Sequence, residues 1–384
     1  MVWLAGLFGL AALGGMALAD LFSEDDDLAD DKAEADQDPL GLETGMETGP
    51  LSPADWIEGV TGTTGDVPGD PVEGAAESGP AGLILSGGPE VDFLSGGDGN
   101  DLLDGAAGQD QINGYGGDDW IRGGAGDDRL FGADGDDLLD GGGGEDQLHG
   151  GYGDDDLEGA AGEDQLFGHA GADRLEGGSG ADRMEGGLGD DVLRGGDGDD
   201  ALHGSEGDDF VEGGAGADTL FGGWGDDTLS GLEPGEAPGI DDLGGIGGSI
   251  GAANAADSAA EDTSGSDFLN GGSGADTIFA GAGDVVTAGE DADGIVLGDW
   301  IAGGDAAELL DYDPAEDQLT LVWDMESDPD PEVEVVTDPA SPGLSHIMVN
   351  GAELARVQGG GPVTVEDIRL VDYTALPDLS PADR

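Results

Sequence analysis

Residues 96–230 read GGDGNDLLD GAAGQDQIN GYGGDDWIR and keep the same period to GGWGDDTLS at 222–230. The whole stretch is fifteen consecutive nonapeptides. Positions 1 and 4 are Gly in every unit, position 6 is always Asp, and position 8 is always aliphatic or Met. An internal repeat of this regularity decides the fold before any local feature does.

Each constant column has a physical reason. Glycine allows the backbone to take positive φ, so positions 1 to 6 are predicted to form a turn. Positions 7 to 9 are predicted to be a short strand whose middle side chain, at position 8, faces inward. One such strand cannot bury its apolar side chain alone, so the units must stack. Two nonapeptides then make one coil, residues i and i+18 lie above one another, and two sheets enclose a Leu-rich core.

Stacked turns also bring oxygen atoms together. Each turn places the position 6 carboxylate and several backbone carbonyls beside those of the turn two units away, and such an oxygen cage suits Ca²⁺ rather than Zn²⁺. The chain has no Cys and four His, so little supports a soft-metal site. The predicted ligands are the position 6 aspartates of the fifteen units and of one later repeat: Asp101, Asp110, Asp119, Asp128, Asp137, Asp146, Asp155, Asp164, Asp173, Asp182, Asp191, Asp200, Asp209, Asp218, Asp227 and Asp276.

The pattern G-G-x-G-x-D-x-U-x, in which U is a large aliphatic residue, resembles the repeats-in-toxin (RTX, haemolysin-type) calcium-binding nonapeptide. The resemblance covers about a third of the chain without a gap. It implies a parallel β-roll with Ca²⁺ between stacked turns, in a protein exported by the type I secretion machinery. In that family the C-terminal segment is also the uncleaved export signal, which would here be residues 365–384.

The number and strength of the calcium sites follow from the columns. Pairing each turn with the one two units later gives 15 − 2 = 13 neighbouring pairs, so up to about 13 ions are expected in the uninterrupted roll. Position 5 is Ala at Ala172, Ala181 and Ala217, where weaker sites are expected. Non-glycine side chains at position 2 are expected to distort some turns; they belong to Ala106, Tyr115, Ala133, Ala160, His169 and Ser205.

The charge of the chain is extreme. It carries 89 acidic and 9 basic residues, a formal net charge of −80, which excludes nucleic acid and anionic membranes as electrostatic partners. Residues 96–230 contain 36 acidic residues and 5 Arg, or 5 − 36 = −31, and thirteen Ca²⁺ would supply +26. Without metal the carboxylates repel and the Gly-rich chain loses much entropy on ordering, so the metal-free roll is expected to be unfolded. This favours an extracellular, secreted protein, either free or associated with the cell surface.

The N-terminal part of the chain divides by composition. Residues 1–19 are uncharged and apolar, and a signal peptide, an uncleaved anchor and neither of these remain open interpretations. Residues 20–81 are too acidic and too poor in apolar residues to bury a core, which indicates a disordered spacer. The roll is predicted to span 82–230, with the imperfect repeat at 87–95 as its first cap.

The C-terminal part begins where the period breaks. Residues 231–264 are a Gly/Ala-rich insertion, and 265–299 are degenerate repeats that lose the nine-residue spacing after 279. Strand-like runs over 300–384 predict a small antiparallel β domain that caps the roll, with a hairpin turn at Asn350 and Gly351. The predicted fold class is therefore all-β, a parallel β-roll with an antiparallel cap and a disordered acidic N-terminal region.

Catalytic motifs are almost absent. No HExxH occurs, and the GxSxG match at 247–251 lies within the low-complexity insertion. The four histidines, at 149, 169, 203 and 346, are scattered without metal spacing and are expected to be solvent-exposed. The sequence thus favours a non-enzymatic calcium-binding protein with a structural or adhesive role. The alternative is a secreted hydrolase with its active site in the C-terminal region.

One asymmetry points to a second surface. Position 9 of the even-numbered units includes Phe131, Phe167 and Phe221, with His149 and His203 between them. All of these side chains are expected to point outward from one sheet as an aromatic stripe. The stripe is a candidate docking surface for a partner, a glycan or a second copy of the chain, although aromatic residues also favour strands for purely structural reasons.

Overall fold

The computed structural model describes residues 72–73, 82–232, 265–301, 305–325, 328–341 and 343–372, all within the compact unit Thr48–Arg384. The segment 1–19, most of the predicted spacer, the GxSxG match and nearly all of the insertion lie outside the described residues. Within the described ranges the secondary structure is β, apart from the short 3-10 helices η2 (Asp299–Ile301) and η3 (Val365–Asp367). No helix in these ranges is long and apolar enough to cross a bilayer.

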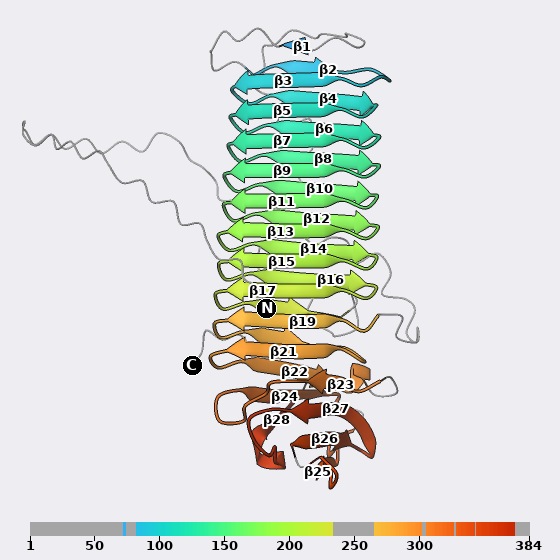
Figure 1. Ribbon diagram of the computed structural model, residues 1–384, viewed down its shortest axis with the longest axis vertical. Helices are drawn as coiled ribbons and strands as arrows, with labels where there is room; N and C mark the ends of the chain where they lie inside the picture. Colours follow the sequence, from blue (N-terminus) through green and yellow to red (C-terminus); the bar gives the residue numbers. More distant parts are fainter. Residues whose placement is uncertain are drawn as a thin grey trace, which may run out of the picture. The chain divides into compact units, whose positions relative to one another are not determined.

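Successive strands alternate between two sheets, so that the chain winds in coils that stack on one another (Figure 1). The 15-stranded sheet consists of β1 (Val72–Glu73), β3 (Phe93–Asp98), β5 (Gln111–Gly116), β7 (Arg129–Asp134), β9 (Gln147–Tyr152), β11 (Gln165–Ala170), β13 (Arg183–Leu188), β15 (Ala201–Glu206), β17 (Thr219–Trp224), β19 (Phe268–Ser273), β21 (Val285–Glu290), β23 (Ala307–Leu309), β27 (Ala352–Gln358), β26 (Leu344–Val349) and β25 (Val333–Thr337).

The 13-stranded sheet is built from the intervening strands. It consists of β2 (Ile84–Ser86), β4 (Leu102–Ala107), β6 (Trp120–Ala125), β8 (Leu138–Gly143), β10 (Asp156–Ala161), β12 (Arg174–Ser179), β14 (Val192–Asp197), β16 (Phe210–Ala215), β18 (Thr228–Ser230), β20 (Thr277–Phe279), β22 (Gly294–Gly298), β24 (Gln318–Trp323) and β28 (Ile368–Asp372).

The register of the roll confirms the two-repeat coil. Strand β10 pairs in parallel with β12, and Leu157 lies opposite Leu175, the same position two repeats later. The same spacing relates Leu166 to Met184 in the other sheet. Every position 8 side chain between residues 96 and 230 is at most 1% exposed. These side chains form the core between the two sheets, as the inward direction of position 8 predicted.

The strands are longer than the sequence predicted. Each full strand of the roll has six residues, running from position 7 through position 3 of the next unit, as in Leu102–Ala107. Only positions 4 to 6 remain as the turn, so the prediction that positions 1 to 6 form a turn was wrong. The ladder skips position 1, as at Gly105, and resumes at Ala106. Because the pairing is interrupted only at position 1, positions 2 and 3 still belong to the strand.

The backbone of the turns is uniform. Positions 2 and 4 have positive φ in all fifteen units, including the non-glycine side chains at position 2, whose φ lies between 73° and 96°. The distortion expected there is therefore not found. These residues adopt the same left-handed conformation as glycine, at a cost of roughly 1 kcal/mol or more each.

The roll continues past the insertion. Strand β19 pairs in parallel with β17, and Leu269 lies opposite Leu220, so the core column is kept on both sides of the inserted sequence. The next coil is one residue short, because Val286 lies opposite Leu269 where the strict period would place Thr287. Residues 280–299 lose the nine-residue spacing for this reason, yet β21 and β22 still add one strand to each sheet.

The C-terminal region is only partly antiparallel. Strands β25, β26 and β27 form an antiparallel meander, and the turn at Asn350 (φ 53°) and Gly351 (φ 83°) confirms the predicted hairpin. Strands β23, β24 and β28, however, pair in parallel with the sheets of the roll. Leu319, Leu321 and Trp323 of β24 are buried in the same core, so pairing covers the end of the roll directly and not through a separate antiparallel domain.

Candidate metal centre

The sixteen predicted aspartates lie in two rows, one at each edge of the roll. The first carboxylate row lies in the turns from odd- to even-numbered strands and contains Asp101, Asp119, Asp137, Asp155, Asp173, Asp191, Asp209, Asp227 and Asp276. The second carboxylate row lies in the opposite turns and contains Asp110, Asp128, Asp146, Asp164, Asp182, Asp200 and Asp218. Every one of these residues is at most 4% exposed.

Each row is tied together by one repeated hydrogen bond. The backbone N–H of Asp137 donates to Oδ1 of Asp155, in the following coil, at 2.8 Å. The same bond crosses the insertion, because the N–H of Asp227 donates to Oδ1 of Asp276 at 2.9 Å. Every coil therefore orients its carboxylate by binding a backbone group of the coil before it.

The rows extend beyond the predicted residues. At the N-terminal end of the second row, the backbone N–H of Asp92 donates to Oδ1 of Asp110. At the C-terminal ends, the N–H of Asp267 donates to Oδ1 of Asp284, and the N–H of Asp276 donates to Oδ1 of Asp293. Sequence reasoning missed Asp284 and Asp293 because the turn before them lacks one residue. The aliphatic residue two positions after each aspartate, Val286 and Ile295, is the pattern that could have identified them.

The second oxygen of each predicted carboxylate has no hydrogen-bond partner in the part of the chain that the structure describes. Oδ2 of all sixteen predicted aspartates, and of Asp293, is buried without a hydrogen bond among the described residues. A buried charged oxygen without a partner is strongly unfavourable, since it has lost water and gained nothing. A bound cation is the usual solution to this arrangement, and these atoms fit one.

Position 1 lies so close to this oxygen that a side chain there would collide with it. A Cβ on Gly141 would lie 2.7 Å from Oδ2 of Asp146 and 3.1 Å from the carbonyl oxygen of Gly159. Position 1 has no positive φ, so its glycine is needed for space and not for backbone freedom. The carboxylate oxygen and the carbonyl oxygen of the next coil thus face one small volume, and hard oxygens of this kind suit Ca²⁺.

Burial also perturbs the acidity of the rows. Desolvation, opposed by the backbone hydrogen bond and reinforced by neighbouring carboxylates, raises the pKa of Asp119, Asp155, Asp191 and Asp227 to about 8. The pKa of Asp137, which lies between two of them, is raised to about 6 for the same reasons. The ionised rows therefore require positive charge from outside the chain.

The arginines of the roll do not supply that charge. Arg122 pairs with Asp140 at 3.4 Å and Arg194 with Glu212 at 3.1 Å, both on the outer face of the 13-stranded sheet. Among the described residues no ion pair reaches a position 6 aspartate. Neutralisation of the rows therefore has to come from bound cations or from protons.

Position 5 has a role that the sequence reasoning did not identify. Oδ1 of Asp118 accepts the backbone N–H of Asp136, and Oδ1 of Asp136 accepts that of Asp154, at 3.2 and 3.0 Å. Each position 5 carboxylate thus accepts from the following coil, whereas each position 6 carboxylate accepts from the preceding coil. Where position 5 is Ala, as at Ala172, the side chain has no oxygen with which to cap the next coil.

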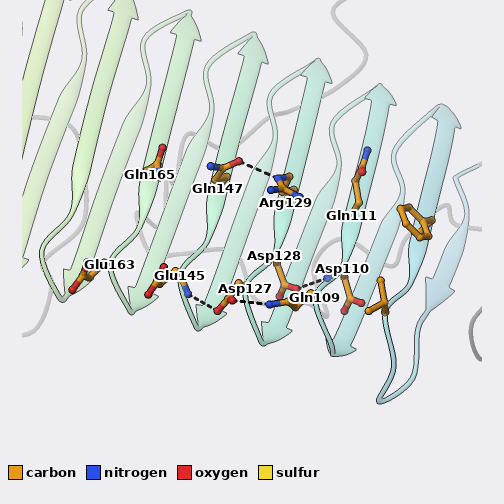
Figure 2. Close-up of a pocket in the computed structure, with 12 residues that line it drawn as sticks. Gln109, Asp110, Gln111, Asp127, Asp128, Arg129, Glu145, Gln147, Glu163 and Gln165 are labelled. Carbon is orange, nitrogen blue, oxygen red and sulfur yellow. Dashed lines mark hydrogen bonds between the residues drawn. The ribbon is translucent and has the colours of Figure 1, made fainter.

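A polar groove lies on the 15-stranded sheet beside the second carboxylate row (Figure 2). Gln109 Nε2 donates to Oδ2 of Asp127 at 2.7 Å, and Arg129 Nε donates to Oε1 of Gln147 at 3.1 Å, both along the stacking direction. The lining residues are amides, carboxylates, one arginine and the apolar pair Val91 and Phe93. This groove contains no His, Ser, Thr, Cys or Lys, and its ionisable side chains are carboxylates and Arg129.

No group of three or more His, Cys, Asp or Glu side chains converges among the described residues. The reason is that each turn supplies one buried carboxylate, while the other oxygens near it are backbone carbonyls. A binding site built this way has few side-chain ligands and depends on the stacking of turns. Isolated units could not form it.

His169 and His203 are exposed as expected, whereas His149 and His346 are partly buried. His149 Nδ1 lies 3.0 Å from His169 Nε2, so these two histidines are not scattered as the sequence suggested. The predicted aromatic stripe is present, since the rings of Phe131 and Phe167 stack on either side of His149. Whether the stripe binds a partner stays a prediction.

The comparisons with known proteins agree with this geometry. A model of the RTX calcium-binding nonapeptide repeat matches six segments of the chain, residues 84–112, 113–148, 149–184, 176–211, 203–233 and 261–295. No curated protein matches the chain. RTX nonapeptide repeats bind Ca²⁺, and a β-roll of such repeats is a non-catalytic repeat fold. With its parallel coils, aliphatic core and two rows of buried aspartates, the chain is an RTX calcium-binding nonapeptide repeat protein.

Proposed function

We propose that both carboxylate rows bind Ca²⁺, with the sixteen position 6 aspartates and the neighbouring turn carbonyls as ligands. The observation that carries this proposal is the unbroken series of buried Oδ2 atoms without partners. Ca²⁺ would supply the positive charge that lets these carboxylates stay ionised in a dry environment, and it prefers oxygen ligands of this type.

Ion binding then drives folding of the roll. The 36 acidic residues and 5 Arg of residues 96–230 leave a charge of −31, which thirteen ions of charge +2 reduce to −31 + 26 = −5. Without them, self-repulsion and the ordering entropy of the Gly-rich chain oppose the fold. Free energy of metal binding is therefore expected to appear as free energy of folding.

Such a metal-dependent fold suits a protein that leaves the cell before it folds. We therefore propose export by a type I secretion machinery, with residues 365–384 as the C-terminal export signal, and an extracellular or cell-surface location. The proposed role there is structural or adhesive, since a long regular roll offers repeated surface and the polar groove holds no Ser, Cys or His side chain.

A calcium titration of the full chain, followed by far-UV circular dichroism, tests the proposal. We expect a cooperative gain of β signal with Ca²⁺ and none with the same concentration of Mg²⁺, which demands a tighter octahedral site. Equilibrium dialysis should give about 13 ions for the uninterrupted roll, plus those of the later coils. A complete β signal in chelator at neutral pH would show that the core suffices without metal and would remove calcium-driven folding.

A further inference from the structure

Four rings form one cluster on the outer face of the 15-stranded sheet. His149 of β9 is sandwiched between Phe131 and Phe167, with ring centroids 5.0 and 4.8 Å apart and interplanar angles of 4° and 9°. His169 stacks at the side of the same group, 5.3 Å from His149 and 6.1 Å from Phe167. The phenyl rings restrict the rotamer of His149 and direct its Nδ1 towards His169.

His169 occupies a position where glycine would be easier. Its φ is 78°, and Gly stands at this position in nine of the fifteen units. A non-glycine residue in the left-handed region costs roughly 1–3 kcal/mol, and five other residues of this column share that conformation, so the contact and not the strain distinguishes His169. The gain from placing a histidine here is the contact with His149, because Nε2 of His169 lies 3.0 Å from its Nδ1.

The chemistry of the pair differs from that of the carboxylate rows. Two imidazole nitrogens face one another on the outer surface of the sheet, whereas the rows present oxygen atoms in the turns. Burial, and secondarily the proximity of His169, lowers the pKa of His149, so that its ring is neutral at neutral pH. Neutral imidazole is the form that binds a transition metal.

We propose that His149 and His169 form a bidentate site for a divalent transition-metal ion of the Cu²⁺ or Ni²⁺ type, separate from the calcium sites. Imidazole nitrogen suits these ions, and Cu²⁺ stands highest in affinity among the divalent first-row metals. No third His, Cys, Asp or Glu joins the pair among the described residues, so water completes the coordination.

The distance selects the geometry. Two nitrogens 3.0 Å apart, each about 2.0–2.1 Å from a metal, subtend an angle of about 90° at that metal. That angle fits cis positions of a square-planar or octahedral ion and is narrow for tetrahedral Zn²⁺.

Binding requires a change of tautomer and a rotation of both rings, because 3.0 Å between the nitrogens and 5.3 Å between the ring centroids place the two facing nitrogens head-on. In the metal-free pair one ring donates a hydrogen bond to the other, so one facing nitrogen carries a proton. That proton moves, through solvent, to the outer nitrogen of the same ring, and both facing lone pairs then bind the metal. Because the proton only moves within one ring, binding itself releases no proton.

The test uses the full chain, saturated with Ca²⁺ so that the carboxylate rows are filled, and titrates it with Cu²⁺. We expect one equivalent whose electron paramagnetic resonance spectrum shows coupling to two nitrogens. That equivalent should be lost in His149→Gln and in His169→Gln. It should be retained in the matched control His203→Gln, since His203 belongs to the same column but contacts Ser205 and Phe221 instead of a second histidine. Equal Cu²⁺ binding and an unchanged spectrum in His149→Gln would overturn the proposal.

A gain-of-function variant makes the test independent of any loss of fold. Two coils after the histidine pair, Glu185 of β13 occupies the position of His149 and Ser205 of β15 occupies the position of His169. Ser205 already has a φ of 96°. Glu185→His with Ser205→His should therefore add a second two-nitrogen Cu²⁺ equivalent, and failure to add one in a chain that still folds with Ca²⁺ would overturn the geometric argument. Because calcium-dependent β signal is read separately, loss of this site and loss of the proposed calcium function are distinguishable.

Discussion

The regular coils of residues 96–230 and the irregular coils after residue 265 build the same structure by different means. In the first region every unit carries glycine at positions 1 and 4. In the second, Ala280 and Ala288 stand at position 1, both at most 1% exposed, and one turn is a residue shorter. Both regions keep the buried aspartate and the aliphatic core residue two positions later. The parallel stack therefore requires these two columns but not glycine at every position 1.

The difference in the glycine column bears on the metal. At Gly141 no side chain stands beside the aspartate oxygen, whereas at Ala288 a methyl group occupies the equivalent position. Oδ2 of Asp293, five residues after Ala288, is still buried without a partner among the described residues. We therefore expect the calcium rows to be strongest in the regular coils and weakest where alanine stands at position 1.

The largest expected effect is that of pH on the metal-free roll. A carboxyl whose pKa rises on folding binds its proton more tightly in the folded state, so its stabilisation is complete below about 3.8, its unfolded value, and is lost as pH rises through about 6 to 8. In chelator, the β signal in far-UV circular dichroism should therefore be larger at pH 4 than at pH 8.5. With saturating Ca²⁺ the roll should instead be more stable at pH 8.5 than at pH 4, because protons compete with the metal for the carboxylates. The same order in both conditions would contradict the assignment of these carboxylates as ligands.

Loss of three adjacent ligands should have the next largest effect. Asp137→Ala, Asp155→Ala and Asp173→Ala together remove three backbone caps and three carboxylates from the first row, at about 1–3 kcal/mol for each cap alone. The calcium midpoint for folding should rise, and about three ions should be lost by equilibrium dialysis. The matched control changes the net charge equally by replacing three exposed acidic residues of position 3, namely Asp134, Asp197 and Glu206. If both variants lose the same number of bound ions, the row aspartates act only through the net charge of the chain and not as specific ligands.

A pair of single substitutions tests the glycine column directly. Gly141→Ala puts a methyl group 2.7 Å from Oδ2 of Asp146, and we expect a destabilisation of about 1–3 kcal/mol in Ca²⁺. Ala288→Gly should cost less than about 1 kcal/mol, the usual penalty of glycine in a strand. Urea unfolding at saturating Ca²⁺ measures both. If Gly141→Ala destabilises the protein no more than Ala288→Gly does, then the calcium-loaded roll does not need glycine at position 1.

The smallest expected effect concerns the aromatic stripe. Phe221 is 39% exposed, whereas the ring faces of Phe131 and Phe167 contact His149. If the stripe mediates self-association, replacing all three with Ser should shift sedimentation of the calcium-loaded chain towards the monomer, with most of the shift from Phe221→Ser alone. Identical sedimentation of all variants would leave the stripe a purely structural stack.

Much of this protein was determined by its sequence alone. The nine-residue period places Leu157 over Leu175 and Asp137 over Asp155 without any knowledge of the tertiary structure, since residues that repeat every two units must stack. The hairpin at Asn350 is equally local, because both turn residues tolerate positive φ. In each case the information lies in a short stretch or in a strict repeat.

Only the tertiary structure decided the rest. The reason for glycine at position 1 appears only when Oδ2 and the carbonyl of the next coil are seen beside it. The parallel pairing of β28 with β24 joins segments that are far apart in the sequence, and no repeat predicts it. The contact between His149 and His169 links positions that the period does not superpose, because position 9 of one coil lies beside position 2 of the next. Contacts that cross the period depend on where the backbone directs each side chain, and that is a property of the assembled coils.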